Sequence, residues 1–233
     1  MSEEVKTNSH GAVIRPEEGW KPAKDEEFNK IISECDQVEG WSVIKEQKSD
    51  AGVTKSWSSS ESGNANLKVK VYSDIFKKVP IETLVDVILD PDYRKMWDGS
   101  CIECTTVEKI DDWNEINYYS AKAPSPVSNR DWLNKCASAV FVRKDGLLEY
   151  VTFNRSVVDP ACPEKPGFVR ACSFLTGYVM RQIVNEDGSK GSEITYYTHG
   201  VNETNILFYF IYSFILIIII IKGIWRMDSY MGC

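Results

Sequence analysis

A run of strand-forming segments fills the chain between Gly99 and His199, and this run most limits what the chain can fold into. Two of its connections contain Asp-Gly, at Asp145-Gly146 and Asp187-Gly188, a pair typical of hairpin turns. Hairpins place consecutive strands side by side in antiparallel order. The sequence therefore predicts an antiparallel sheet, with strands over residues 101–110, 114–122, 131–142, 147–157, 169–184 and 193–199.

The chain before this run favours both helices and strands. Apolar residues fall at helical spacing from Phe28 to Cys35 and again from Ile81 to Ile88. Residues 52–60 and 66–72 alternate with period two around a polar loop, which predicts two more strands. A short helical turn is expected over Tyr93–Asp98. Helix, strands, helix and then a long run of strands indicate an α+β domain.

The two ends of the chain differ in composition from the part between them. Residues 1–24 carry Glu, Lys, Pro and Gly with almost no apolar periodicity, so we expect a mobile leader there. The folded domain is then expected over residues 25–203. Residues 204–233 form an apolar tail, in which Ile206 to Ile221 contains no charged residue and no polar face.

Three interpretations of this tail are open: a membrane anchor, a divergent lid over the domain, or the aberrant end of a truncated isoform or misread gene model. As a helix, residues 206–221 would be about 24 Å long, shorter than the ~30 Å hydrocarbon core of a bilayer. A run of isoleucine also lacks the period of an amphipathic lid. We therefore favour the third interpretation.

Charge and residue counts exclude several classes of function. Lys and Arg number 27 and Asp and Glu 34, a net charge of -7, so we expect no nucleic-acid partner. The only histidines, His10 and His199, stand far apart, which argues against a metal site, a cofactor or a catalytic histidine relay. Seven cysteines without a repeated spacing, and no apolar segment typical of a signal peptide at the start, favour a reducing, cytoplasmic setting.

Three motifs, in this order, carry a resemblance to a known family: YRKMWD at 93–98, PSPVSNRD at 124–131 and GFVR at 167–170. In these motifs the chain resembles the START lipid-transfer family, and more narrowly its phosphatidylcholine-transfer-protein-like branch. The resemblance implies a helix-grip fold, in which a curved antiparallel sheet with an N-terminal helix encloses a lipid tunnel. The family closes the tunnel with a long C-terminal helix. Here that lid helix is expected to be atypical or missing, because the resemblance stops after His199.

The resemblance places the phosphate-binding pair of this branch on Arg94 and Asp98. By spacing alone, two residues four apart on a helical turn would form an ordinary exposed ion pair. A guanidinium can also bind a phosphodiester through two hydrogen bonds while the carboxylate orients it and offsets its charge. We therefore expect Arg94 and Asp98 to bind a lipid phosphate.

The resemblance also places a head-group cage on three aromatic residues, Tyr119, Trp132 and Phe174. A quaternary ammonium has no N–H to donate, so ring faces recognise it best. Neither Trp132 nor Phe174 offers the acceptor that a primary ammonium would prefer, which favours choline over ethanolamine. Without the resemblance, three aromatic residues on strands would be interpreted as part of the hydrophobic core, where such residues usually lie.

These observations predict a protein that binds a glycerophospholipid and transfers it between membranes, without catalysis. Its expected partners are the lipid and the membrane surface, and the expected state is a monomer in the cytoplasm. Residues 206–221 offer a second route to membrane association. The alternatives are a lipid-sensing module anchored by its tail, or a helix-grip enzyme of the cyclase type.

Overall fold

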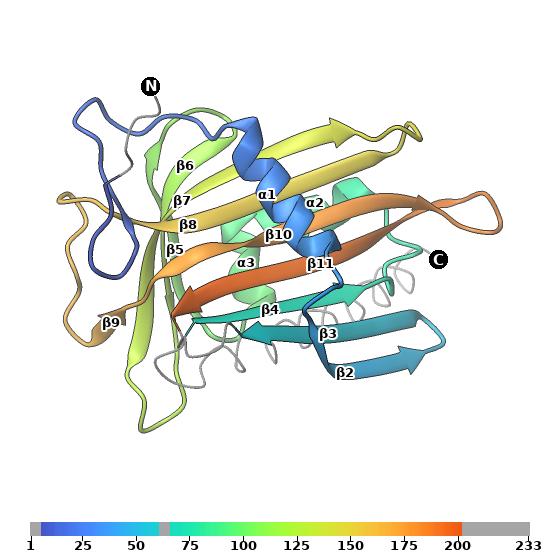
Figure 1. Ribbon diagram of the computed structural model, residues 1–233, viewed down its shortest axis with the longest axis horizontal. Helices are drawn as coiled ribbons and strands as arrows, with labels where there is room; N and C mark the ends of the chain where they lie inside the picture. Colours follow the sequence, from blue (N-terminus) through green and yellow to red (C-terminus); the bar gives the residue numbers. More distant parts are fainter. Residues whose placement is uncertain (1–5, 61–65, 202–233) are drawn as a thin grey trace.

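The computed structural model describes residues 6–60 and 66–201, and within them one long curved sheet dominates (Figure 1). Neighbouring strands along its main path pair in antiparallel order, so the predicted α+β class and antiparallel sheet are confirmed. In spatial order the path runs β2 (Ser42–Ser49), β3 (Gly52–Ser60), β4 (Asn66–Ser73), β11 (Lys190–Val201), β10 (Ser173–Val184), β8 (Leu148–Val158), β7 (Asn129–Val142), β6 (Asn114–Ala121) and β5 (Cys101–Lys109).

Two short strands join this path in parallel and were not predicted as separate elements. β1 (Val13–Ile14) pairs with the end of β8, and β9 (Phe168–Arg170) pairs with the start of β7. The single strand expected over residues 169–184 is therefore two strands, β9 and β10. The edge strand β2 was also missed, because every one of its residues is exposed and no apolar alternation marks a buried face.

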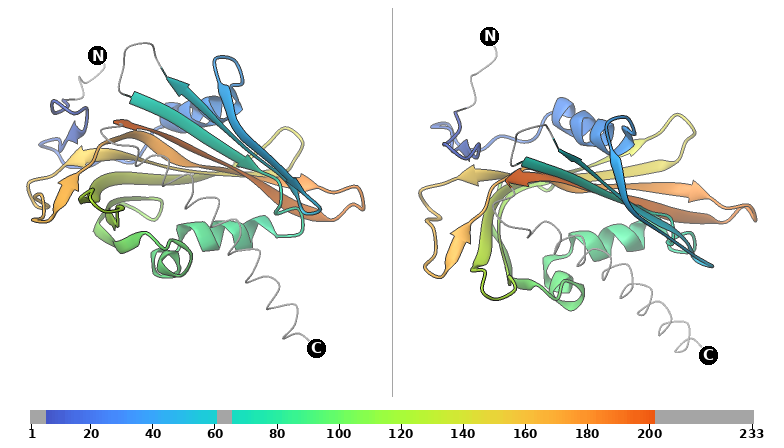
Figure 2. Two further views of the ribbon diagram at one scale, coloured as in Figure 1. Left: turned by 90° about the horizontal axis from the view of Figure 1, so that it is seen from below. Right: turned by 60° about the horizontal axis from the view of Figure 1, so that its bottom comes forward.

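The helices cover opposite faces of the sheet (Figure 2). α1 (Asp25–Asp36) lies on one face, where it buries Phe28, Ile31 and Cys35, the stripe that the helical spacing predicted. α2 (Ile81–Leu89) and the short α3 (Pro91–Trp97) lie on the other face. Because side chains alternate along a strand, Val179 packs in the core beneath α1 while its neighbour Met180 packs in the core beneath α2.

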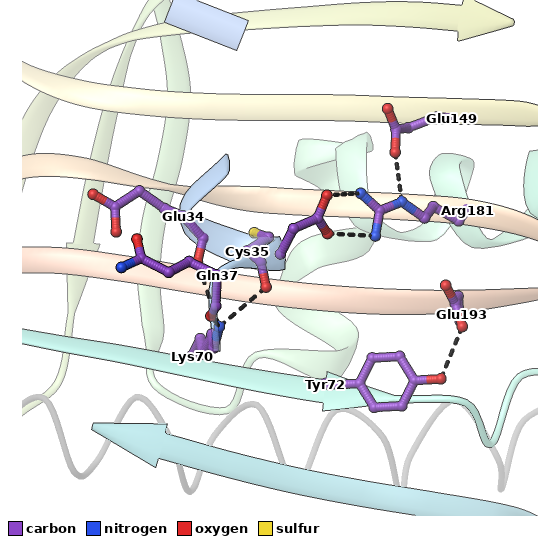
Figure 3. Close-up of polar contacts among 9 residues, drawn as sticks. Glu34, Cys35, Gln37, Lys70, Tyr72, Glu149, Arg181 and Glu193 are labelled. Carbon is purple, nitrogen blue, oxygen red and sulfur yellow. Dashed lines mark hydrogen bonds and ion pairs between the residues drawn. The ribbon is translucent and has the colours of Figure 1, made fainter. Parts of the chain in front are cut away.

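Two cationic side chains, the buried Lys70 and the half-buried Arg181, connect the end of α1 to the sheet (Figure 3). Arg181 of β10 donates to both carboxylate oxygens of Asp36, at 2.7 and 3.0 Å, and to Glu149 at 2.5 Å. The Lys70 ammonium donates to the backbone carbonyls of Cys35, at 3.1 Å, and Gln37. These carbonyls have no partner within the helix, so Lys70 both satisfies them and complements the helix dipole.

Residues 6–24, for which the sequence predicts a mobile leader, lie beside the sheet and contact it. Arg15 donates to Asp159 at 2.5 Å and to Glu108 at 2.7 Å, and Trp20 donates to the same oxygen of Asp159 at 3.2 Å. Val13 is buried in a cluster on β6, β7 and β8. Long-range contacts therefore give this segment a defined place beside the sheet, which its composition alone does not predict.

None of the helices within residues 6–60 and 66–201 is long and apolar enough to cross a membrane. The expectations for the tail, including residues 206–221, concern a part of the chain outside the described residues.

Candidate functional site

A cavity of about 1110 Å³ opens on the face of the sheet that carries α2 and α3. Its wall combines inward residues of the central strands with Ile88 of α2 and Arg94 of α3. Residues of the N-terminal segment, among them His10 and Ile14, also border it. The cavity therefore draws on parts of the chain that are far apart in sequence, and Arg94 is the cation expected to act there.

Local sequence places Arg94 and Asp98 at the end of a capped helical turn. The carboxylate of Asp90 caps α3 by accepting from the backbone N–H groups of Asp92 and Tyr93, at 2.8 and 3.1 Å. The helix ends at Trp97, one residue before Asp98, so Arg94 Nε reaches Asp98 Oδ2 over 3.2 Å. The predicted pairing of these two residues is present.

The Asp98 carboxylate is only 4% exposed and organises the polar end of the cavity. Its Oδ2 accepts from the Tyr119 hydroxyl at 2.8 Å as well as from Arg94. Its Oδ1 accepts from the backbone N–H and the hydroxyl of Ser100, at 3.2 and 2.6 Å. Four donors thus hold this carboxylate, which sets the direction of the Arg94 side chain.

Two aromatic rings flank the Arg94 guanidinium, whose central carbon lies 4.9 Å from the ring centre of Trp97 and 4.8 Å from that of Tyr119. Burial alone would lower the pKa of Arg94, but the oxygens of Tyr119, Tyr178 and Asp98 raise it well above its usual range. The site therefore presents a permanent, oriented positive charge to the cavity. That charge is complementary to a phosphate.

Tyr119 and Trp132 are brought together, as the predicted cage requires. They are register partners on β6 and β7, with ring centres 5.6 Å apart and planes inclined by 41°. Both line the cavity. Burial raises the pKa of Tyr119 well above its usual range, so the phenol stays neutral and keeps the proton that it donates to Asp98.

Phe174 lies apart from Tyr119 and Trp132 and does not line the cavity, although the sequence predicts it in the same cage. Ser173 opposes Gly200 and Leu175 opposes His199, which leaves Phe174 as the extra residue of a β-bulge. Its ring packs 4.9 Å from that of His199 and covers Gly11, where a Cβ would come within 2.6 Å of it. Phe174 is absent from the cavity lining and shares a small hollow with residues of α1. Counting residues along the chain from the family motifs cannot detect this bulge, and that count is what placed Phe174 in the cage.

Two further groups in the cavity were not predicted from the sequence. Tyr178 of β10 and Tyr196 of β11 are neighbours with ring centres 5.1 Å apart. Both line the part of the cavity that carries Arg94. Beyond them the inner face is polar: it carries a row of amides and hydroxyls on β6, β7, β8, β10 and β11. The row comprises Asn117, Asn134, Asn154, Ser156, Ser173, Thr176 and Thr198.

Two thiols complete the polar side of the cavity, and burial raises the pKa of both Cys104 and Cys136. They are therefore protonated, and not nucleophilic, at neutral pH. The described residues contain no group of three or more His, Cys, Asp or Glu side chains that could hold a metal ion. The arrangement offers one fixed cation, ring faces and neutral hydrogen-bonding groups, which together suit an amphiphile with an anionic group.

Most of this chain is similar in sequence to known proteins. The family model for the START domain matches residues 25–200. START domain-containing protein 10 of mouse is 33% identical over 178 residues, 74% of this chain and 55% of that protein. Phosphatidylcholine transfer protein of rat is 33% identical over 134 residues, 55% of this chain and 56% of that protein. The chain thus spans little more than half the length of these two relatives.

Solved structures share the fold. A crystal structure of human STARD10 matches with a TM-score of 0.66 and 27% identity, covering 81% of this chain and 72% of that one. Human StAR-related lipid transfer protein 5 matches with the same TM-score at 18% identity, which shows the fold alone, and covers 83% of this chain and 89% of that one. The predicted helix-grip fold is confirmed. The chain belongs to the START domain family, in the branch that contains phosphatidylcholine transfer protein.

Proposed function

We propose that this chain binds one glycerophospholipid in the cavity, phosphatidylcholine in preference to phosphatidylethanolamine, and transfers it between membranes without a covalent step. The observation that carries the proposal is the Arg94–Asp98–Tyr119 cluster, in which Asp98 and Tyr119 are buried, at the wall of a cavity of about 1110 Å³. The names of the relatives, among them a phosphatidylcholine transfer protein, support the same class of ligand.

In this proposal the phosphodiester binds the Arg94 guanidinium. Asp98 holds the guanidinium in place and balances its charge while the cavity is empty. The bound phosphate then adds charge-assisted hydrogen bonds, which are about twice as strong as neutral ones. Selectivity for the phosphate thus comes from a cation whose direction is set before the lipid arrives.

The choline group would contact the paired rings of Tyr119 and Trp132. Each ring face contributes about 0.5 to 2 kcal/mol toward a methylated ammonium, depending on how completely water is excluded. With Phe174 on the α1 side of the sheet, two rings carry this role in place of the three expected. Burial of the acyl chains supplies most of the binding energy, at about 0.8 kcal/mol per methylene group.

Lipid capture tests the proposal directly. The full chain is incubated with vesicles of equal parts phosphatidylcholine, phosphatidylethanolamine and phosphatidylinositol, re-isolated, and its lipid identified by mass spectrometry. We expect about one unmodified phosphatidylcholine per chain, and transfer of that lipid to acceptor vesicles. Recovery of no phospholipid, or of a chemically altered one, would contradict the proposal.

A further inference from the structure

Three carboxamide side chains line the cavity next to the aromatic pair. Asn117 of β6 is the register partner of Asn134 of β7, just as Tyr119 is the partner of Trp132. Two residues along a strand span about 7 Å, so the amides lie one inward row away from the rings. Asn154 of β8 extends the group, opposite Cys136, the next inward residue of β7.

The amide nitrogens of these side chains lack good acceptors among the described residues. Asn134 is 7% exposed, and its Oδ1 accepts from the Ser156 hydroxyl at 2.9 Å, whereas no residue within 6–60 and 66–201 accepts from its Nδ2. Asn117 is 8% exposed, and its Nδ2 meets only the Cys104 sulfur, at 3.8 Å, a weak acceptor. The Asn154 amide makes no side-chain hydrogen bond within the same part of the chain.

The unpaired amide nitrogens of Asn134 and Asn154 are not among the fully buried polar atoms, so they are accessible from the cavity. An unpaired donor that a ligand shields from water favours a ligand with an acceptor, because otherwise it keeps the cost of its lost hydration. Here the donors of Asn134 and Asn154 line a cavity, so a ligand can supply the acceptor. The nearby cation of Arg94 is the better partner for an anionic group. The amides therefore suit a neutral acceptor, such as a carbonyl oxygen.

We propose that Asn117, Asn134 and Asn154 bind the ester carbonyl oxygens of the ligand, so that the cavity selects ester-linked over ether-linked glycerophospholipids. This inference rests on the proposed function, which places the phosphate at Arg94. In a diacyl glycerophospholipid the two ester carbonyls are attached to the glycerol, a few bonds from the phosphate. This short separation fits the two-residue spacing along β6, about 7 Å, between Tyr119 and Asn117. An ether-linked lipid of equal chain length keeps the head group but has no carbonyl oxygen, so the amide donors stay unpaired.

A competition experiment isolates this contact. The full chain is incubated with vesicles containing equal amounts of diacyl and dialkyl phosphatidylcholine of matched chain length, and the captured lipids are counted by mass spectrometry. We compare the wild type with Asn154→Leu, which removes donors that bind no acceptor among residues 6–60 and 66–201, and with Asn134→Leu. The control is Asn29→Leu on the exposed side of α1, outside the cavity.

We expect the wild type and Asn29→Leu to capture the diacyl lipid in about threefold to tenfold excess, the ratio that one neutral hydrogen bond provides. In Asn154→Leu and Asn134→Leu the excess should fall toward one. Equal capture of both lipids by the wild type, or an unchanged excess in Asn154→Leu, would overturn the inference and leave the proposed function standing. If the wild type captures neither lipid, the proposed function fails and the inference fails with it.

Discussion

The Tyr119 hydroxyl donates to Oδ2 of Asp98 over 2.8 Å, and this contact joins the predicted ring cage to the predicted phosphate site. The same oxygen accepts from Arg94 at 3.2 Å. A ring proposed to contact choline and a guanidinium proposed to contact phosphate therefore share one carboxylate. In a phosphocholine head group these two charged parts are also neighbours, so the positions of the two subsites are coupled.

Replacing Arg94 with Ala should abolish phospholipid capture and leave the fold intact. Loss of a charge-assisted phosphate contact in a water-poor cavity costs about 2 to 4 kcal/mol, or 30-fold or more in affinity. Capture from phosphatidylcholine vesicles and the far-ultraviolet circular dichroism spectrum measure the two quantities. Arg143→Ala, which removes an arginine paired with Asp145 at a hairpin, serves as the matched control. Undiminished capture by Arg94→Ala would remove Arg94 from the site.

Trp132→Ala and Phe174→Ala should differ in their effect on head-group selectivity. Loss of the Trp132 ring face should weaken phosphatidylcholine more than phosphatidylethanolamine, because ring faces favour the methylated ammonium. Phe174 packs against His199 and Gly11, so its replacement should lower stability without changing the ratio of the two lipids. Mixed-vesicle capture gives that ratio. The assignment reverses if Phe174→Ala, and not Trp132→Ala, changes it.

Replacing Asp98 with Asn should destabilise the protein even without lipid. The change leaves the Arg94 charge without its counter-charge, and removal of one partner of a fully buried pair costs about 3 to 5 kcal/mol. Since 25% of the Arg94 side chain is exposed, we expect a smaller loss, about 1 to 3 kcal/mol in the free energy of unfolding. Urea unfolding measures it. Asp112→Asn, at an exposed pair with Lys109, should show no such change.

The attachment of residues 6–24 should weaken in acid. Burial alone would raise the pKa of Asp159, but the N–H of Ala161, Arg15 and Trp20 together lower it below its usual value. A lowered folded-state pKa means that the stabilisation is present above the ordinary value of about 3.9 and is lost as the pH falls through the folded-state pKa. The protection factors of the Val13 and Ile14 amides against hydrogen exchange should therefore fall below about pH 4. In Arg15→Ala these protection factors should be low at every pH; high protection in that variant would show that the ion pairs do not hold the segment.

Deleting residues 204–233 should raise the soluble yield of the domain. The run from Ile206 to Ile221 combines high apolarity with no charge, the composition of an aggregation-prone segment. Expression of both versions, followed by measurement of soluble protein and of vesicle-to-vesicle transfer, checks this. If the full chain is soluble and transfers lipid rapidly while the deletion does neither, the segment acts as a lid, and our preferred interpretation of the tail is wrong.

Local patterns predicted most of the elements because each depends on residues close in sequence. The apolar stripe of α1 and the alternation of β3 and β4 appear where they were expected, with Phe28 and Ile31 buried. The pairing of Arg94 with Asp98 follows from the four-residue spacing on one helical turn. In the edge strand β2 no face is buried, so no alternation could reveal it.

The sequence by itself determined the family, the α+β class and the cation of the candidate site, because motifs, periodicity and helical spacing are local properties. Only the tertiary structure decided which inward residues meet in the cavity. A one-residue bulge turns Phe174 away from it, and the registers of β6 with β7 and of β7 with β8 gather Asn117, Asn134 and Asn154. The physical reason is that a side chain alternates between faces with every residue, so one extra residue or a shift in register, invisible in the sequence, changes which side of the sheet it occupies.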